Sequence, residues 1–364
     1  MSSKDETQRL RSVANTTLLV ASVVVIIAGA RFASPLLQPL LMSLFLAIIF
    51  GSPVASLRRR GLSPWFAAGL VAVIIVSIVS AVFVMFSHAI EQFHKAVPLY
   101  HREFDELLNR TTSWLSARGI KVSEQAVEAA FHPGRALSYF ASFIGGVSGA
   151  LSNIFLILFT VAFLLVDAAG FPRKLAANIP HHQHSVLAMV RDLVQSLNDY
   201  MEAKAVISLA TALLVWLGLY LLEVDFAELW ALLAFFLNFI PTIGSIIAAV
   251  PVVLLSVLDM DPLHTMLVVA LYLGVNIVMG NVVEPAWMGR RVGLSTLTVF
   301  LSVIFWGWMF GAVGTLLSVP LTMVVKFVAE RHPGASWLAL LLSAPPPDDQ
   351  TSRSLDADTP ESIQ

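Results

Sequence analysis

The sequence predicts an all-α, polytopic transmembrane helical protein, and three observations support this prediction. The 364 residues are 57% hydrophobic and only 13% charged, with a mean hydropathy of +0.80, whereas a soluble domain carries about 25% charged residues. About eight hydrophobic blocks without charged side chains are long enough to enter or cross a bilayer as helices. Two blocks are too long for one crossing and contain central Pro or Gly. We therefore expect two broken or re-entrant helical hairpins, together with an amphipathic extracytoplasmic helical segment.

The first 87 residues are predicted to form three membrane helices. Lys4, Arg9 and Arg11 precede the first block, and Ala28–Ala30 resembles a signal-peptide cleavage site. The uncharged stretch that starts at Ser12 is close to a full span in length, so we expect a retained first helix. The three blocks occupy residues 12–30, 32–57 and 61–87.

Residues 88–135 differ from the blocks around them because apolar and charged residues are mixed. The apolar residues recur every three or four positions, which is typical of an amphipathic helix or helix pair that Pro98 would kink. We predict an extracytoplasmic helical cap that packs on itself or on a neighbouring subunit, with substrate capture as the alternative. The apolar positions are Ile90, Phe93, Val97, Tyr100, Phe104, Leu107, Leu108, Trp114 and Leu115.

The remaining segments are assigned from the same hydropathy pattern. A membrane helix is predicted at 136–167, a cytoplasmic connection at 168–203 and a transport half at 204–332. The C-terminal end, 333–364, is rich in Pro, Asp and Ser from about residue 344, and this composition predicts a disordered tail. The blocks of the transport half are 205–222, 229–258, 263–283 and 292–325.

The blocks 229–258 and 292–325 are predicted to fold as hairpins. Each would extend about 45–50 Å as one helix, against a hydrocarbon core of about 30 Å. Pro lacks an N–H and its ring opposes the carbonyl four residues back, whereas Gly allows the chain to turn. The breaking residues are Asn238, Pro241 and Gly244 in the first block, and Gly307, Gly311 and Gly314 in the second, which Pro320 closes.

These two breaks form the candidate substrate path. Backbone groups freed inside a bilayer must find partners. A hydroxyl-rich solute is one such partner, and Asn238 would add a donor and an acceptor. The alternative is a kink whose backbone groups are satisfied by neighbouring helices. Gly307 and Gly311 also suit close helix packing, and Trp306 and Trp308 are either interface anchors or ligand-stacking groups.

Other polar residues in or beside the membrane blocks are candidates for a gate. Asn276 and Asn281 lie in the seventh block, where polar side chains are costly and usually face the bundle interior. Glu284, followed by Pro285, is expected to pair with one of the arginines that follow it, with proton coupling as the alternative. Asp167 ends the fourth block and is expected to cap that helix or to pair with a nearby basic residue. An acidic turn before the first hairpin is interpreted as solvated, with cation attraction as the alternative; it consists of Glu223, Asp225 and Glu228.

Composition excludes several classes of function. The formal net charge of -2 gives no indication of a nucleic-acid partner, and the chain contains no Cys, which removes disulfides, Cys-ligated zinc and thiol catalysis. His181, His182 and His184 lie in a polar loop without other metal ligands at set spacing. The sequence has no Walker-type phosphate loop. We therefore expect no enzyme activity, no cofactor and no metal.

The distribution of Lys and Arg predicts the orientation in the membrane. If the N-terminus is cytoplasmic, Arg58–Arg60 and most basic residues of the short loops also lie inside, and the only basic residue of the short outer connections is Arg31. Both termini are then cytoplasmic. A helix followed by a hairpin occurs twice with opposite topology, which is typical of transporters with a site near the midplane.

The motifs at the two hairpins resemble one known family. The patterns N-F-I-P-x-I-G at Asn238–Gly244, G-N-x-x-E-P-x-x-M-G from Gly280 and F-W-G-W-x-x-G-x-x-G from Phe305 resemble those of the autoinducer-2 exporter family of permeases, and the resemblance covers roughly residues 12–332. It implies export of autoinducer-2, a small hydroxyl-rich quorum-sensing signal. The chain departs from the family at Ala203-Lys204, where a Gly-Gln pair is expected, and this departure puts a role for that site in doubt.

The sequence therefore predicts a secondary transporter of the bacterial inner membrane that exports a small polar metabolite. Its expected partners are the solute, a coupling ion (H⁺ or Na⁺), the lipid bilayer and further copies of the chain in a homo-oligomer. One alternative is a Na⁺(Li⁺)/H⁺ antiporter, an activity that the resemblance also allows. A second alternative is a membrane scaffold that does not transport and that assembles a partner complex through residues 88–135.

Overall fold

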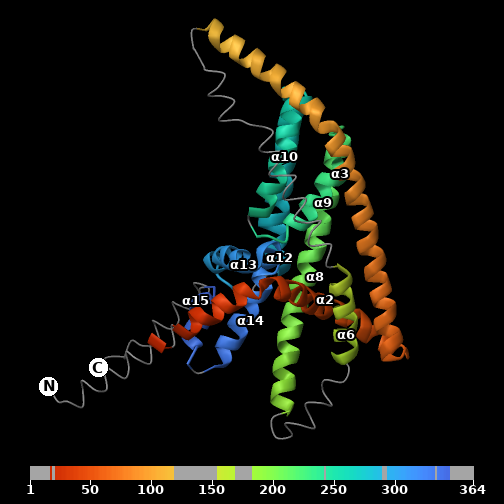
Figure 1. Cartoon of the computed structure of the whole chain (residues 1–364), viewed down its shortest axis with the longest axis vertical. Helices are drawn as coiled ribbons and strands as arrows, with labels where there is room; N and C mark the ends of the chain where they lie inside the picture. The colour runs from red at the N-terminus through yellow and green to blue at the C-terminus, as the bar shows by residue number, and fades with distance from the viewer. Residues whose placement is uncertain are drawn as a thin grey trace, which may run out of the picture. The chain divides into compact units, whose positions relative to one another are not determined.

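A computed structural model describes most of the chain, and its regular structure is helical. The described residues are 17–18, 21–118, 154–168, 183–241, 243–288, 293–332 and 334–344. Among them, helices account for all regular elements apart from one isolated bridge between Leu294 and Ser343 (Figure 1). The chain divides into two compact units, the first formed by Met1–His181 with Phe305–Leu317 and the second by His182–Ile304 with Ser318–Gln364.

The helices confirm the predicted fold class. Five described helices are long and apolar enough to cross a membrane, and shorter apolar helices accompany them. Each of the predicted hydrophobic blocks contains at least one helix. The five long candidates are Ser34–Arg59, Pro64–Val82, Val186–Leu221, Pro262–Trp287 and Thr296–Leu316, and the shorter ones are Ala21–Phe32, Leu156–Ala168, Ala227–Leu237 and Ile243–Asp259.

The first unit is built on three mutually packed helices, α2 (Ser34–Arg59), α3 (Pro64–Ala117) and α6 (Ile154–Ala168). Small residues allow their close approach, because Ala67 and Ala68 of α3 are almost fully buried in the apolar cluster between the helices. The hydroxyl of Ser43 donates to the carbonyl of Pro39 in its own helix and lies 3.1 Å from the carbonyl of Ile157 in α6. A polar group thus helps to set the contact of α2 with α6.

The helix α3 is longer than the third hydrophobic block. It continues from that block through residue 87 and through Pro98 to Ala117 as one helix. The continuation carries exposed ion pairs at helical spacing, such as Lys95 with Glu91 at 2.7 Å, which lowers the pKa of Glu91. The rest of the predicted cap, beyond residue 118, lies outside the described residues.

The second unit is organised around the long helix α8 (Gln183–Leu221), which packs against α9, α11, α12 and α14. The carboxylate of Asp261 caps α11 by accepting from the backbone N–H of His264 at 2.8 Å, and this hydrogen bond holds the pKa of Asp261 below its ordinary value. The other elements of this unit are α9 (Ala227–Leu237), α10 (Ile243–Asp259), α11 (Pro262–Asn276), the π-helix η1 (Ile277–Val283), α12 (Glu284–Met288), α14 (Ser318–Arg331) and α15 (Ser336–Leu342). The helix α13 (Thr296–Leu316) belongs to this unit up to Ile304 and to the first unit from Phe305.

The end of the described chain is tied to the start of α13. The backbone N–H of Ser295 donates to Leu342 at 3.0 Å, and that of Ala344 donates to Gly293 at 3.1 Å. The ammonium of Lys326, on α14, donates to the same Gly293 carbonyl at 2.6 Å. These bonds fix the base of the second hairpin. The tail beyond residue 344, predicted to be disordered, lies outside the described residues.

Candidate functional site

One face of α8 carries a buried column of polar side chains inside a candidate membrane span. Lys204, Ser208 and Thr211 are 1%, 0% and 7% exposed, and their spacing of four and three residues places them on one face of the helix. Polar side chains within a membrane span are costly and usually belong to functional sites. We call these three residues the polar column.

The middle of the polar column contacts the first break. The helix α9 ends at Leu237, and the side-chain amide of the next residue, Asn238, donates to the hydroxyl of Ser208 at 3.0 Å. Among the described residues, Ser208 is the only hydrogen-bond partner of the Asn238 side chain. Its amide oxygen and second amide hydrogen therefore remain for a further partner.

The first long block breaks as predicted. After Asn238 the chain makes a tight turn in which the N–H of Ile243 donates to the carbonyl of Pro241 at 2.7 Å, and α10 begins at Ile243. Gly244 lies against the carbonyl of Leu237, where a β-carbon would overlap the backbone. The two arms thus meet at a glycine because no larger residue fits between them.

The first residue of α12, Glu284, forms an ion pair with Lys204 of the polar column. The ammonium of Lys204 lies 2.6 Å from Oε1 of Glu284, and the side chains are 2% and 26% exposed. Glu284 therefore pairs with Lys204, the lysine at which the chain departs from the family pattern. The expected partners, Arg290 and Arg291, lie outside the described residues.

The π-helix η1 sets the position of Glu284. The N–H of Glu284 donates to the carbonyl of Met279, five residues back, which is the π pattern. Pro285 follows, and its ring would oppose the carbonyl of Asn281 in a regular α-helix, so the wider turn relieves this clash. Short π segments inside helices often lie at functional sites.

The helices α8 and α11–α12 are antiparallel over a considerable length. Lys204 meets Glu284, and Gly218 lies so close to Leu271 that a β-carbon there would overlap the leucine side chain. Residue numbers thus rise along one helix as they fall along the other. Both members of the ion pair stand at the ends of charge-free blocks, 205–222 and 263–283, and hence at the same end of the two helices.

The second long block also breaks, at one of its glycines. Phe310 and Gly311 leave the helical conformation, and Gly311 has φ 58° and ψ −141°, which L residues with a side chain rarely adopt. Gly307 and Gly314 are not breaks. They lie where the two arms touch, Gly307 against Thr315 and Gly314 against the carbonyl of Trp306.

The prediction that Pro320 closes this block is wrong. Pro320 lies in the first turn of α14, where backbone N–H groups have no partner within the helix, so its missing N–H removes no helical hydrogen bond. The hydrophobic block therefore continues directly into another helix.

The tip of the second hairpin is held by a residue that sequence reasoning did not select. The guanidinium of Arg31 donates to the carbonyl of Met309 at 2.9 Å and lies over the ring of Trp308 at 5.6 Å. The break at Gly311 disturbs the hydrogen bonds of nearby carbonyls, and Arg31 satisfies one of them. The signal in the sequence was its isolation as the one basic residue of the short outer connections.

Several predicted residues lie away from the polar column. Asn276, Asn281 and Pro285 are exposed on their helices, so the described chain does not bury them. Asp167 is exposed at the end of α6, and its expected partners, Arg173 and Lys174, lie outside the described residues. The gate role of these residues stays a prediction.

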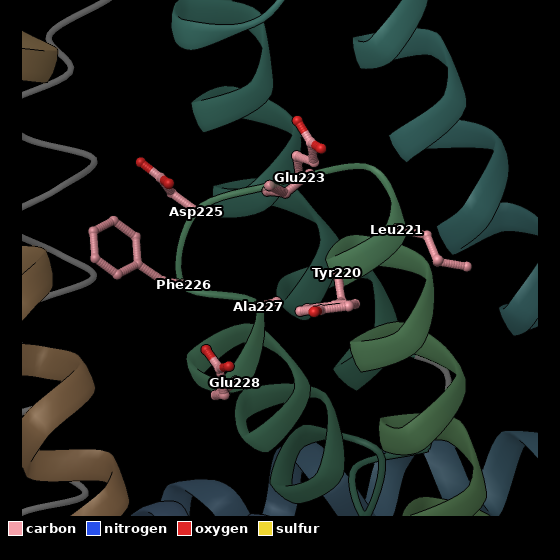
Figure 2. A pocket seen from close by; sticks show the side chains of 8 residues that line it. Tyr220, Leu221, Glu223, Asp225, Phe226, Ala227 and Glu228 are labelled. Carbon is pink, nitrogen blue, oxygen red and sulfur yellow. The ribbon is translucent and has the colours of Figure 1, made fainter.

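The acidic turn between α8 and α9 lines a depression of about 480 Å³. Figure 2 shows the side chains of Glu223 and Asp225 projecting from the loop, Glu228 from the first turn of α9, and Tyr220 from the end of α8. Glu223 and Phe226 have positive φ angles, 56° and 60°. Glu223, Asp225 and Glu228 are all exposed, which agrees with the interpretation of a solvated turn.

The fold shows the structural class of this protein, which is a multi-pass α-helical membrane protein with two interrupted helices. A family model described as AI-2E family transporter matches residues 20–333, and the chain belongs to this family of transporters. Nearly the whole chain is covered by the match.

Individual relatives agree with the family. The AI-2 transport protein TqsA of Escherichia coli (strain K12) is 36% identical over 326 residues, 90% of this chain and 94% of the relative. The provisionally named transport protein YhhT of the same organism is 35% identical, over 89% of this chain and 93% of its own length. A provisionally named transport protein of Haemophilus influenzae is 34% identical over 90% and 95%.

Proposed function

We propose that this protein is a secondary transporter that exports a small polar metabolite, with autoinducer-2 as the first candidate solute. Support for the solute comes from the 36% identity to a relative named as an AI-2 transport protein. Support for the path comes from one observation: the amide of Asn238 stands at a helix break and is held by the buried hydroxyl of Ser208.

The chemistry of this place suits a hydroxylated solute. Asn238 uses one amide hydrogen on Ser208, so its oxygen and its other hydrogen can bind a solute hydroxyl as acceptor and donor. The backbone N–H groups from Asn238 to Ile240 and those of Ile243 and Gly244 already donate to carbonyls of the chain, so the spare hydrogen-bonding capacity lies on the Asn238 side chain. A solute rich in hydroxyls would pair these amide groups, whereas an apolar solute would leave them unpaired.

The remaining features of the proposal come from the sequence. We place the protein in the bacterial inner membrane with both termini cytoplasmic, on the distribution of Lys and Arg. The two hairpins would enclose the solute, a gradient of H⁺ or Na⁺ would drive it, and a homo-oligomer is the expected assembly. The predicted helix-plus-hairpin repeat supports alternating access around a midplane site.

The experiment is a flux assay with purified protein in liposomes under an imposed proton gradient. Labelled autoinducer-2 uptake is measured for the wild type and for Asn238→Ala and Ser208→Ala. We expect both variants to lower the initial rate about tenfold, since each removes one hydrogen bond of the path. The matched controls are Asn109→Ala and Ser77→Ala, which change exposed residues of α3 and should leave the rate unchanged.

Other results would select the alternatives. Proton flux on addition of Na⁺ or Li⁺ without movement of the solute would support the antiporter. We rank that function second because Glu284, the carboxylate it would use, is already paired with Lys204. If neither flux appears, and Asn238→Ala keeps the cellular phenotype while deletion of residues 95–130 abolishes it, the scaffold hypothesis stands and transport fails.

A further inference from the structure

The ion pair of α8 and α12 contains a cation that belongs to the protein itself. Lys204 is almost completely buried, and Glu284 is its only partner among the described residues. Both residues lie in candidate membrane spans, Val186–Leu221 and Pro262–Trp287. A carboxylate at such a place attracts a cation, and here the chain supplies one.

We propose that Lys204 is a tethered counter-ion that fills the position of a monovalent metal cation beside Glu284 and so makes this transporter indifferent to Na⁺ and Li⁺ at that carboxylate. The inference rests on the proposed function, because it names the ion dependence of the same transport path. Its consequence is that removal of the ammonium converts the position into a Na⁺ site.

The geometry leaves no room for a second cation between the two groups. The distance from Nζ to Oε1 is 2.6 Å, a direct, charge-assisted hydrogen bond without an intervening ion or water. The buried ammonium neutralises the partly exposed carboxylate by direct contact. An added Na⁺ would therefore have to displace a cation that is covalently attached and cannot diffuse away.

The surroundings of Glu284 could hold an ion once the ammonium is gone. Its side chain is 26% exposed, so an ion from solution can reach the carboxylate. Pro285, the next residue, has no N–H, so one carbonyl of the preceding turn lacks its regular helical donor. Carboxylate and carbonyl oxygens are the ligands that hard cations prefer.

The experiment compares the thermal unfolding of purified full-length protein in Na⁺ and in choline at constant ionic strength. The wild type should unfold at the same temperature in both salts. Lys204→Gln should gain about 2–5 °C as Na⁺ replaces choline, because a ligand that binds only the folded state stabilises it by mass action. The double variant Lys204→Gln with Glu284→Gln should lose this response.

A matched control removes a lysine from an equally short but solvent-exposed pair. Lys95 lies 2.7 Å from Glu91, with side chains 73% and 63% exposed. Lys95→Gln should show no specific Na⁺ response, because water and screening already satisfy an exposed carboxylate. A general effect of salt on variants that lose a lysine would appear in this control.

Three results would overturn the proposal: stabilisation of the wild type by Na⁺, an equal Na⁺ response in the double variant, or no Na⁺ response in Lys204→Gln. If Lys204→Gln is too unstable to purify in choline, Lys204→Gln and a second variant, Lys204→Met, are both purified in high Na⁺. Failure of Na⁺ to restore either variant also counts against the proposal, since Na⁺ would then not replace the ammonium. The readout needs no solute, so absent autoinducer-2 flux in the wild type would count against the proposed function alone.

Discussion

The glycines of the two hairpins are required for different structural reasons, although each interrupts a long hydrophobic block in the sequence. Gly311 alone among the predicted breaking glycines has a positive φ, 58°, so its backbone conformation is what requires glycine. Gly244 has no such conformation and is required by space, because its α-carbon lies against the carbonyl of Leu237. The sequence predicts a turn at both glycines, and only the three-dimensional structure separates a turn from a close contact.

We predict that Gly244→Ala strongly destabilises the first hairpin. The new β-carbon would overlap backbone atoms of Leu237, which cannot move as a side-chain end can, and overpacking of this kind costs about 1–3 kcal/mol or more. Thermal unfolding in detergent measures the effect. Gly274→Ala on α11 is the control, since a β-carbon there meets nothing within 4 Å; equal midpoints for both variants would refute the close contact.

Lys204 shows the limit of single-residue reasoning. In the sequence it looks like a departure from the family pattern at the edge of a charge-free block. Its partner, Glu284, is 80 positions away, and the pair exists because α8 runs antiparallel to α11 and α12. A spacing rule within one helix cannot reveal such a contact.

At the scale of elements, the two helix breaks could be predicted from the sequence, but the contact of Arg31 that holds the second break could not. Blocks 229–258 and 292–325 exceed one span and contain Pro or Gly, and both break. Arg31 lies 278 positions from Met309, whose carbonyl it binds. The π-helix η1 was missed as well, because hydrophobic periodicity over seven residues does not separate a π-helix from an α-helix.

We predict that Arg31→Gln loosens the tip of the second hairpin. The Met309 carbonyl would lose its charged donor and Trp308 its cation, so the tip should open more often. Because the chain has no Cys, Met309→Cys gives a single probe at a position that is 4% exposed. We expect maleimide to label this cysteine about fivefold faster in the Arg31→Gln background.

The control for this experiment is Arg118→Gln, which removes an arginine 3.9 Å from the ring of Trp114 on α3. It deletes a similar stacking contact away from the hairpin tip and should leave the labelling rate of Met309→Cys unchanged. An unchanged rate in Arg31→Gln would show that the tip is held by packing alone.

For the whole molecule, the hydrophobic blocks allow the fold class to be predicted because a membrane imposes a length on every apolar segment. The same rule fails where a helix leaves the membrane: α3 continues to Ala117 without a break, since helix formation does not stop where apolar composition stops. The predicted domain boundaries at residues 87, 135, 167, 203 and 332, and the orientation, stay predictions.

We predict that both termini are cytoplasmic, and two single-cysteine variants of the Cys-free chain test this orientation. Ser63→Cys, in the loop between α2 and α3 that follows Arg58–Arg60, should resist a membrane-impermeant maleimide in intact cells. Asp225→Cys, in the acidic turn, should be labelled. Both residues are exposed or partly exposed in the structure, so burial does not explain protection. The reverse pattern would invert the topology and the proposed direction of transport.

The widened turn in η1 also has a consequence for how related sequences are aligned. A π segment holds more residues per turn than an α-helix, so deletion of one residue within Ile277–Val283 would let the helix return to the α form. Glu284 would then keep roughly its present face, because the wider turn absorbs the extra residue and does not pass a rotation of about 100° to the residues that follow. A one-residue alignment gap at this place is therefore compatible with the pairing of Glu284 with Lys204, whereas the same gap in a regular α-helix would turn Glu284 away from α8.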